Sequence, residues 1–385
     1  MGKLYITGAK RTAIGGLSGA LSSQAASRLG GEAIRAALAQ AENPAPDEVV
    51  MGNVLMAGQG QAPARQAARH AGLDWSVPAT TVNKMCGSGM QAAMMTADRL
   101  MRCGGTGVAG GMESMSRAPH LVLETRKGFR MGHRKIYDSM FLDGLEDAYE
   151  PGTLMGVYAE RTAQERQISR EAQDEFALSS LGRARAASEG AFRREIVPVA
   201  VADGKSETTV QRDEQLAAAR PDKIPHLKPA FVADGTVTAA NSSSISDGAA
   251  ALVLQADAAP PKTARAEWMG QASHSELPNN FTVAPIGAIQ KLLDQTGWGV
   301  EDVDLFEVNE AFAVVALAVR EHFSIDAERF NVHGGACALG HPIGASAARV
   351  IVTLLGALEE RNLKRGVASV CIGGGEATAI AVTRV

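Results

Sequence analysis

Cys86 has the sequence setting that best suits a nucleophile. It follows a β-branched run and stands beside Gly87 and Gly89, at what reads as the start of a long apolar helix. Helix amino termini carry partial positive charge and free N–H groups, so this position would favour a thiolate. A buried, inert cysteine is the ordinary alternative. The strand-to-helix position favours the nucleophile, because ligands bind at the carboxyl ends of parallel strands.

His341 is the candidate general base for this thiol. It precedes Pro342 and has Gly340 and Gly344 close by, a pattern that predicts an exposed turn leading into a helix. A single histidine is more often structural than catalytic, but the glycines leave room for a substrate. A neutral imidazole is the usual partner of a thiol nucleophile.

Cys371 and Asn309 both stand where strand-like runs end. Cys371 is followed by Ile372 and by three glycines that start at Gly373, which suggests a backbone that binds something closely. Core packing is the ordinary reading of such a cysteine. Asn309 is either a helix N-cap or an amide that holds a water or an oxyanion.

Length and composition bound the class of protein. A chain of 385 residues with 45% hydrophobic and 21% charged residues is globular and long enough for two or three domains. The net charge of −4 does not suggest the basic surface that nucleic-acid binding normally needs, and no apolar run is long enough to span a membrane. A secretory signal and a peroxisomal ending are both missing from the sequence, so we expect a cytoplasmic protein.

The four cysteines predict free thiols. They are too few for a disulfide framework, and their spacing does not match that of metal ligands. We therefore expect reduced cysteines in a reducing compartment and no metal site.

The hydrophobic pattern predicts an α/β protein with a parallel sheet. Strand-like runs and Ala-rich helices alternate in the first part, with helices at 27–40 and 86–101. From 119 to 233 the charge density rises, and we expect a cap of loops and helices, among them 140–149 and 160–187. The pattern of strand-like and helical segments returns at 237–239 and 249–254.

The C-terminal part repeats the pattern of the first part. Residues 48–53 resemble 304–309, and 106–111 resemble 368–374. A glycine-rich turn opens a long apolar helix in both. These matches in the same order suggest a duplicated α/β unit with a site in the cleft between its halves.

Four blocks resemble the signatures of the thiolase family: 83–89, 309–312, 334–342 and 371–373. Three further segments, 129–149, 227–231 and 234–238, match as well. The resemblance covers essentially the whole chain and implies the α/β thiolase fold. In that fold, duplicated α/β/α halves form a five-layered αβαβα core with an inserted cap domain.

The resemblance also implies domain boundaries and an assembly. The N-terminal half would span residues 1–118 and be completed by about 237–262, the cap (loop) domain 119–236, and the C-terminal half 263–385. Similar short-chain enzymes are homotetramers, dimers of dimers that use a loop in the cap, here 121–135.

The family's catalytic roles carry over to matching residues. Cys86 resembles the nucleophile that takes the acyl group, and His341 the base that activates it and then helps bind an enolate oxygen beside a water held by Asn309. Cys371 resembles the acid/base that removes the α-proton of acetyl-CoA. The N–H groups of Cys86 and Gly373 resemble the other oxyanion hole.

Eight positions resemble residues along the pantetheine path and the acyl pocket, with core packing as the alternative reading. They are Leu145, Met155, Ala230, Phe231, Ser243, Phe281, Ala311 and Phe312. Leu154 replaces a frequent histidine, and Phe281 stands where short-chain relatives often carry methionine. No arginine clearly matches the one that binds the CoA phosphates; the nearby basic residues are Arg212, Arg220 and Lys223.

The implied reaction is the reversible conversion of two acetyl-CoA to acetoacetyl-CoA plus CoA. CoA thioesters are substrates, and no metal or redox cofactor is implied. Alternatives are a β-oxidation 3-ketoacyl-CoA thiolase with longer substrates, a condensing enzyme of fatty-acid synthesis, and a non-catalytic acyl-CoA carrier. A condensing enzyme typically pairs cysteine with two histidines, whereas Cys371 stands at the second base position here.

Overall fold

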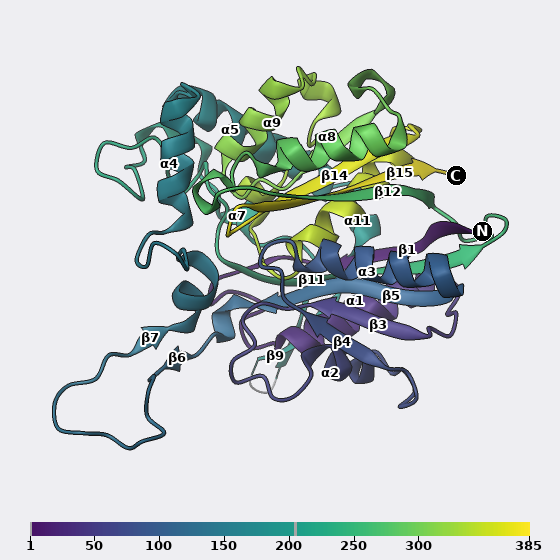
Figure 1. The fold of residues 1–385 in the computed structure, drawn as a ribbon, viewed down its shortest axis with the longest axis horizontal. Coiled ribbons are helices and arrows are strands. Elements are labelled where there is room, and N and C mark those ends of the chain that lie inside the picture. The colour runs from purple at the N-terminus through teal and green to yellow at the C-terminus, as the bar shows by residue number, and fades with distance from the viewer. Residues whose placement is uncertain (1, 204–205) are drawn as a thin grey trace.

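One continuous mixed sheet, folded into two stacked halves that are called the first and second sheet below, forms the frame of the molecule in a computed structural model that describes residues 2–203 and 206–385 (Figure 1). The first sheet contains β1 (Lys3–Thr12), β11 (Ser246–Asp257), β5 (Gly105–Ser114), β3 (Glu48–Gly52) and β4 (Ala79–Val82), in that order. The second contains β13 (Leu305–Val308), β14 (Arg365–Ile372), β15 (Glu376–Arg384) and β12 (Ala266–Ser275). Two residue pairs, Tyr5–Glu267 and Ile6–Ala266, join β1 to β12.

Helices complete five layers (Figure 1). One outer layer is α1 (Ala26–Gln40) with α2 (Pro63–His70), the central layer is α3 (Ser88–Cys103) with α11 (Ser346–Glu360), and the other outer layer is α8 (Ala284–Thr296) with α9 (Ala313–His322). None of the helices in the described chain has both the length and the apolar character that a membrane crossing requires.

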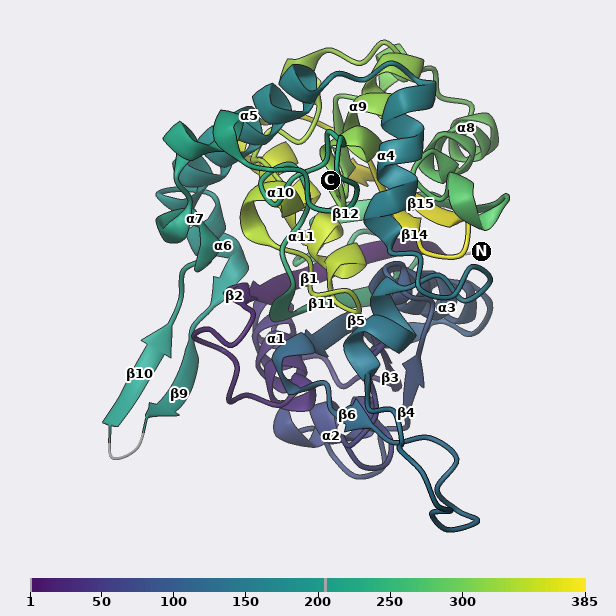
Figure 2. The ribbon, with the colours of Figure 1, turned by 90° about the vertical axis from the view of Figure 1, so that its left-hand side faces the viewer.

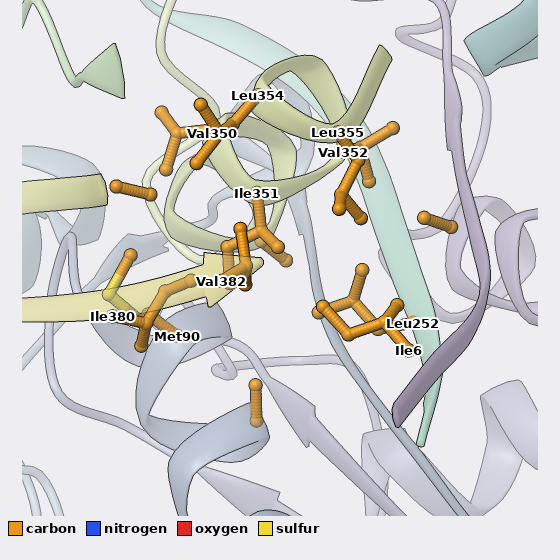
Figure 3. Close-up of a cluster of buried hydrophobic side chains, with 14 of the residues drawn as sticks. Ile6, Met90, Leu252, Val350, Ile351, Val352, Leu354, Leu355, Ile380 and Val382 are labelled. Carbon is orange, nitrogen blue, oxygen red and sulfur yellow. The ribbon is translucent and has the colours of Figure 1, made fainter. Parts of the chain in front are cut away.

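The alternation of side chains along the strands builds this layering. Along β11, Leu252 faces the central helices, while its neighbour Val253 faces α1 and α2. The central core joins side chains of both sheets, such as Ile6 and Ile380, to α3 and α11 (Figure 3). Each Leu or Ile buried there contributes roughly 1.5–3 kcal/mol.

The sheets are mixed, so the prediction of a parallel sheet was only partly right. β3 runs parallel to β4 and β5, but β11 runs antiparallel to β1 and β5. The start of β11 pairs with the end of β5, through Asp247 and Ser114. The chain between β5 and β11 therefore leaves the sheet and returns to it at the same end of these strands. A long hairpin connection of this kind is possible because the two strands are antiparallel.

The chain between β5 and β11 forms an irregular cap with two projections (Figure 2). Its elements are η1 (Met115–Arg117), β6 (His120–Leu121), β7 (Tyr137–Asp138), η2 (Phe141–Leu145), α4 (Met155–Glu165), α5 (Arg170–Ser188), α6 (Phe192–Glu195), β8 (Ile196–Val197), β9 (Val199–Asp203), β10 (Ser206–Val210), α7 (Gln215–Ala218) and η3 (Pro221–His226). One projection is the arm between β6 and β7, and the other is the β9–β10 hairpin.

Two local predictions for the cap and one for the segment that follows it were wrong. The helix expected over 160–187 is two helices, because Gln167 takes a left-handed backbone (φ 56°) between α4 and α5. The helix expected over 140–149 shrinks to the single wide turn η2. Residues 237–239 form a loop; Val237 is buried in it and its carbonyl accepts a hydrogen bond from the N–H of Ala230.

A buried arginine fastens the cap to the first sheet. Arg11 on β1 donates through Nε to Glu195 (2.9 Å) and through both terminal nitrogens to Asp213 (2.8 and 3.0 Å). Asp213 also accepts from the N–H of Ile14 (2.8 Å), and the guanidinium lies 4.7 Å from the ring centre of Phe192. All three charged side chains are buried, so the two carboxylates depend on this one cation.

We expect Arg11→Met to lower the free energy of unfolding by roughly 3–5 kcal/mol, because it leaves two buried carboxylates without a cation. Urea unfolding measures the change. Arg193→Met is the matched control, since its ion pair with Glu189 is largely exposed and should contribute at most about 1 kcal/mol. Equal losses in the two variants would contradict the role of Arg11.

Candidate active site

A largely apolar chamber of about 240 Å³ lies where the two halves meet the cap. Cys86 from the first half and His341 and Gly373 from the second half line its reactive end. The chamber therefore brings together three of the five predicted catalytic residues. Cys371 and Asn309 are fully buried and do not line it.

The loop before α3 holds Cys86 in a fixed backbone conformation. Met85 has a left-handed backbone (φ 47°), and its N–H bonds the side chain of Asn83 (3.0 Å). Ser88 accepts from the N–H of Lys84 (2.9 Å) and donates to the carbonyl of Met85 (2.6 Å). α3 begins at Ser88, so Cys86 precedes the helix instead of opening it.

Gly87 allows this loop to approach the strand that carries Cys371. A Cβ at Gly87 would overlap the side chain of Ile372. Because β14 ends here, its last residues and Gly373 come to lie beside the Cys86 sulfur. The backbone N–H groups of Gly373 and of Cys86 itself favour the charged form of that sulfur and lower its pKa.

The surroundings of Cys86 favour its neutral thiol, against the thiolate that the sequence predicted. Burial raises the pKa of Cys86 to about 11, and the carboxylate of Glu113 adds to the rise. The two N–H groups of Gly373 and Cys86 oppose it without reversing it. The loss of hydration outweighs the helix-end effect, because the sulfur lies in an apolar chamber. Cys86 therefore needs a base at the moment of attack.

His341 is buried, not on the exposed turn that was predicted, yet its ring reaches the chamber. Nδ1 lies 2.6 Å from the hydroxyl of Ser346, which itself donates to the carbonyl of Pro342 (3.0 Å). Nε2 has no protein partner among the described residues. Burial, with the charge of Arg349, lowers the pKa of His341 to about 3, so the imidazole is neutral and can accept a proton.

Cys371 lies behind Cys86, at the end of β14. Its side chain is fully buried, and burial together with the nearness of Cys86 raises its pKa well above that of an ordinary thiol. Because the pKa of Cys371 is raised, a thiolate formed on this side chain would be a strong base.

Asn309 lies behind His341 and caps no helix, because α9 begins at Ala313 after Phe312. Its Nδ2 is 3.5 Å from Nδ1 of His341, and its Oδ1 accepts from Arg349 (3.2 Å). The backbone N–H of Asn309 bonds the carbonyl of Ser369 on β14 (3.0 Å).

Glu113 joins the two halves at this site. Its buried carboxylate accepts from Asn53 Nδ2 (2.6 Å) and from the N–H groups of Val54 (2.9 Å), Leu55 (3.2 Å) and Gly344 (3.0 Å). Burial raises the pKa of Glu113 to about 7, against the effect of these four donors. The turn that carries His341 is thus tied to the first sheet.

Seven of the eight predicted substrate-contact positions line the chamber: Leu145, Met155, Phe231, Ser243, Phe281, Ala311 and Phe312. Ala230 does not; it is exposed beside the chamber. Leu154, noted for replacing a histidine, lies in the wall too.

The three basic residues considered for CoA phosphates separate in space. Arg220 and Lys223 line a neighbouring cavity of about 290 Å³ together with Ser244, which follows the chamber residue Ser243. Arg212 instead pairs with Glu189 (2.9 Å) and lines neither cavity.

Sequence reasoning missed the residues that hold the reactive ones in place. Glu113, Ser346 and Arg349 are buried polar side chains within helix or strand patterns, so their partners come from distant segments. Arg349 and Ser346 lie on α11, one turn apart, which is a weak signal of a shared face. In residues 2–203 and 206–385, no three His, Cys, Asp or Glu side chains gather as metal ligands would.

The comparisons with known proteins agree with this geometry. Residues 4–258 match the family model described as thiolase, N-terminal domain, and residues 262–384 match thiolase, C-terminal domain. The chain belongs to the thiolase family, and the thiolase fold that the sequence suggested is confirmed.

Similar proteins from bacteria and plants are named acetyl-CoA acetyltransferases. Acetyl-CoA acetyltransferase of Cupriavidus necator is 45% identical over all of both chains, and acetyl-CoA acetyltransferase 2 of Arabidopsis thaliana is 49% identical over 97% of this chain and 95% of its own. The crystal structure of the Bacillus anthracis acetyl-CoA acetyltransferase superposes with a TM-score of 0.95 at 36% identity, covering 100% of this chain and 99% of the other.

We expect iodoacetamide to alkylate Cys86 slowly at neutral pH and faster as the pH rises toward its pKa of about 11. The sign follows from the raised pKa, since the thiol persists to higher pH and the thiolate is the reactive form. Peptide mass spectrometry across pH 6–11 measures the rate, and the exposed Cys103 is an internal comparison. A rate that is already maximal near neutral pH would indicate a preformed thiolate and contradict the assignment.

Proposed function

We propose that the protein is an acetyl-CoA C-acetyltransferase that reversibly condenses two acetyl-CoA to acetoacetyl-CoA and CoA. The observation that carries the proposal is the setting of the Cys86 sulfur. The N–H groups of Cys86 and Gly373 favour its charged form, a neutral His341 lines the same chamber, and Cys371 lies behind it. The full-length similarity to acetyl-CoA acetyltransferases supports the same substrate.

In the first half-reaction Cys86 takes the acetyl group. Nε2 of His341 accepts the Cys86 proton while the sulfur attacks the thioester carbonyl. The carbonyl oxygen then lies near the N–H groups of Cys86 and Gly373, and one such donor is worth about 3 kcal/mol. The bond to the CoA sulfur breaks, the CoA thiolate takes the Cys371 proton, and free CoA leaves.

In the second half-reaction the Cys371 thiolate removes the α-proton of another acetyl-CoA. The N–H now on Nε2 of His341, with a water held by Asn309, stabilises the enolate oxygen. The enolate carbon attacks acetyl-Cys86, and the acetyl–sulfur bond breaks. The Cys86 sulfur recovers its proton from His341, which restores the resting state.

The β-oxidation alternative is less well supported, because the relatives named above are acetyl-CoA acetyltransferases. The condensing-enzyme alternative lacks its second histidine, since Cys371 occupies that place at the end of β14. A non-catalytic carrier would not need two reactive side chains in one chamber, Cys86 and His341, with the Cys371 thiol directly behind them.

Acid–base and covalent chemistry by these side chains accounts for every step, so we propose that no metal or redox cofactor takes part. Both sulfurs must be reduced for the reaction to run. A reducing compartment such as the cytoplasm suits this need, and a cytoplasmic location stays a prediction.

We also propose a homotetramer built through the arm between β6 and β7. The arm projects from the body (Figures 1 and 2), and its side chains Val122, Leu123, Phe129, Met131 and Ile136 are exposed. Apolar side chains on such a projection favour contact with another copy.

We expect Cys371→Ala to form acetyl-Cys86 from acetyl-CoA but to lose condensation by on the order of 10²–10⁴-fold, the usual share of a positioned acid or base. Mass spectrometry of the Cys86 peptide reports acetylation, and release of CoA reports condensation. Cys103→Ala is the control, because that side chain is exposed and far along α3 from the chamber. Acetylation found solely on another residue would refute Cys86 as the nucleophile.

We expect acetoacetyl-CoA to be cleaved better than six-carbon or longer 3-oxoacyl-CoA. Phe281 is buried in the chamber wall, edge-on to Tyr158 and Phe312. Phe281→Ala should raise the relative kcat/KM of the six-carbon substrate by roughly tenfold, since two more methylenes are buried at about 0.8 kcal/mol each. A kcat/KM that rises with chain length in the unmodified enzyme would show that Phe281 leaves the pocket open.

Light scattering should give the mass of four chains of 40.1 kDa. Replacing Phe129 and Met131 by serine should reduce the mass to that of two chains, because the apolar contact of the arm is lost. A monomer before any substitution would contradict the assembly, whereas an unchanged tetramer in the variant would contradict the role of the arm.

A further inference from the structure

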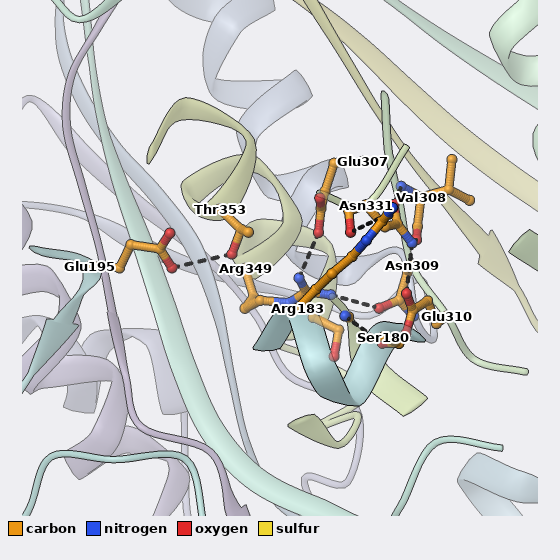
Figure 4. Close-up of polar contacts among 12 residues, drawn as sticks. Ser180, Arg183, Glu195, Glu307, Val308, Asn309, Glu310, Asn331, Arg349 and Thr353 are labelled. Atoms are coloured by element: carbon orange, nitrogen blue, oxygen red, sulfur yellow. Dashed lines mark hydrogen bonds and ion pairs between the residues drawn. The ribbon is translucent and has the colours of Figure 1, made fainter. Parts of the chain in front are cut away.

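A second buried arginine lies next to the reactive end of the chamber, and the reaction outlined above does not use it. Arg349 on α11 is buried and donates through Nη1 to Glu307 (2.9 Å) and through Nη2 to Asn309 Oδ1 (3.2 Å). Glu307 and Asn309 stand two residues apart at the end of β13. Figure 4 shows the guanidinium spanning both side chains.

The chemistry of the guanidinium decides which end of the Asn309 amide faces it. Arginine has donors and no acceptor, so the amide oxygen must point to Arg349 and the NH₂ end must point away. The NH₂ end then lies on the side of His341, with Nδ2 3.5 Å from Nδ1. If the amide were flipped, the NH₂ group of Asn309 would face the N–H groups of Arg349, and two donors would meet in a buried place.

The neighbouring side chains hold the Arg349 guanidinium more firmly than they hold the side-chain amide of Asn309. Glu307 is buried beside the guanidinium, and its carboxyl oxygen accepts from Nη1 (2.9 Å), while burial raises the pKa of Glu307 to about 8 against the effect of the Arg349 charge. Asn331 braces the end of β13, because its side chain bonds both the N–H (2.8 Å) and the carbonyl (2.9 Å) of Val308. The contact with Nη2 is the hydrogen bond that sets the orientation of the Asn309 amide.

We propose that Arg349, anchored by Glu307, is a positioning residue that keeps the NH₂ end of the Asn309 side chain on the side of His341. The inference rests on the proposed function. It assigns Arg349 to the enolate step, where Asn309 acts, and not to the transfer of acetyl to Cys86. Lysine keeps the charge but lacks the fork that serves both partners.

The test separates the two half-reactions in Arg349→Lys. We expect condensation to fall on the order of 10- to 100-fold, as for a weakened oxyanion donor. The rate of acetyl-Cys86 formation should fall less than about threefold, since that step does not use Asn309. Glu307→Gln, which keeps the shape and weakens the anchor of Nη1, should show the same split in milder form.

A double-mutant cycle shows whether Arg349 acts through Asn309. Arg349→Lys should cause no further loss of condensation in an Asn309→Ala background, because the amide it orients is gone. Arg11→Lys is the matched control, since Arg11 is equally buried and holds carboxylates but does not contact Asn309 or His341. Its effect should be additive and equal in both half-reactions.

Equal loss of both half-reactions in Arg349→Lys and in Glu307→Gln, or full additivity with Asn309→Ala, would overturn the inference and leave the proposed function standing. Failure of the unmodified enzyme to form acetyl-Cys86 or to condense it would instead overturn the proposed function. If Arg349→Lys does not fold, as thermal melting would show, the split and the cycle measured with Glu307→Gln decide.

Discussion

The contact between the two halves at Glu113 is the constraint on which the site depends. Each half brings an incomplete set of groups, Cys86 from one and His341 with Cys371 from the other. A buried carboxylate that accepts four N–H bonds, one of them from Gly344 in the opposite half, fixes the turns against each other. A buried charge with unmade bonds is costly, so this register is strongly preferred over neighbouring ones.

Burial sets the resting protonation of the site. Cys86 and His341 both shift toward their neutral forms, so the free enzyme holds a thiol beside an imidazole and not an ion pair. Charge then develops when a thioester fills the chamber, next to N–H groups that are already in place. The same burial makes Cys371 a weak acid, and its thiolate a base strong enough to draw a proton from carbon.

Polar networks, and not apolar packing alone, hold the catalytic segments. Arg11 ties the cap to β1, while Arg349 ties the end of β13 to α11. α11 takes part in both, because Thr353, one turn beyond Arg349, donates to Glu195 (3.2 Å) (Figure 4). A helix in the middle layer thus links the cap, the two sheets and the side chain of Asn309.

The sequence by itself determined the residue types, the order of the catalytic blocks and the duplicated α/β pattern, because these depend on local spacing and side-chain alternation. It did not determine strand direction, since pairing of β11 with β5 joins segments far apart along the chain. It also missed Glu113 and Arg349, and misjudged the charge of Cys86 and the exposure of His341. Tertiary structure decided these, because burial and long-range hydrogen bonds set both pKa and orientation.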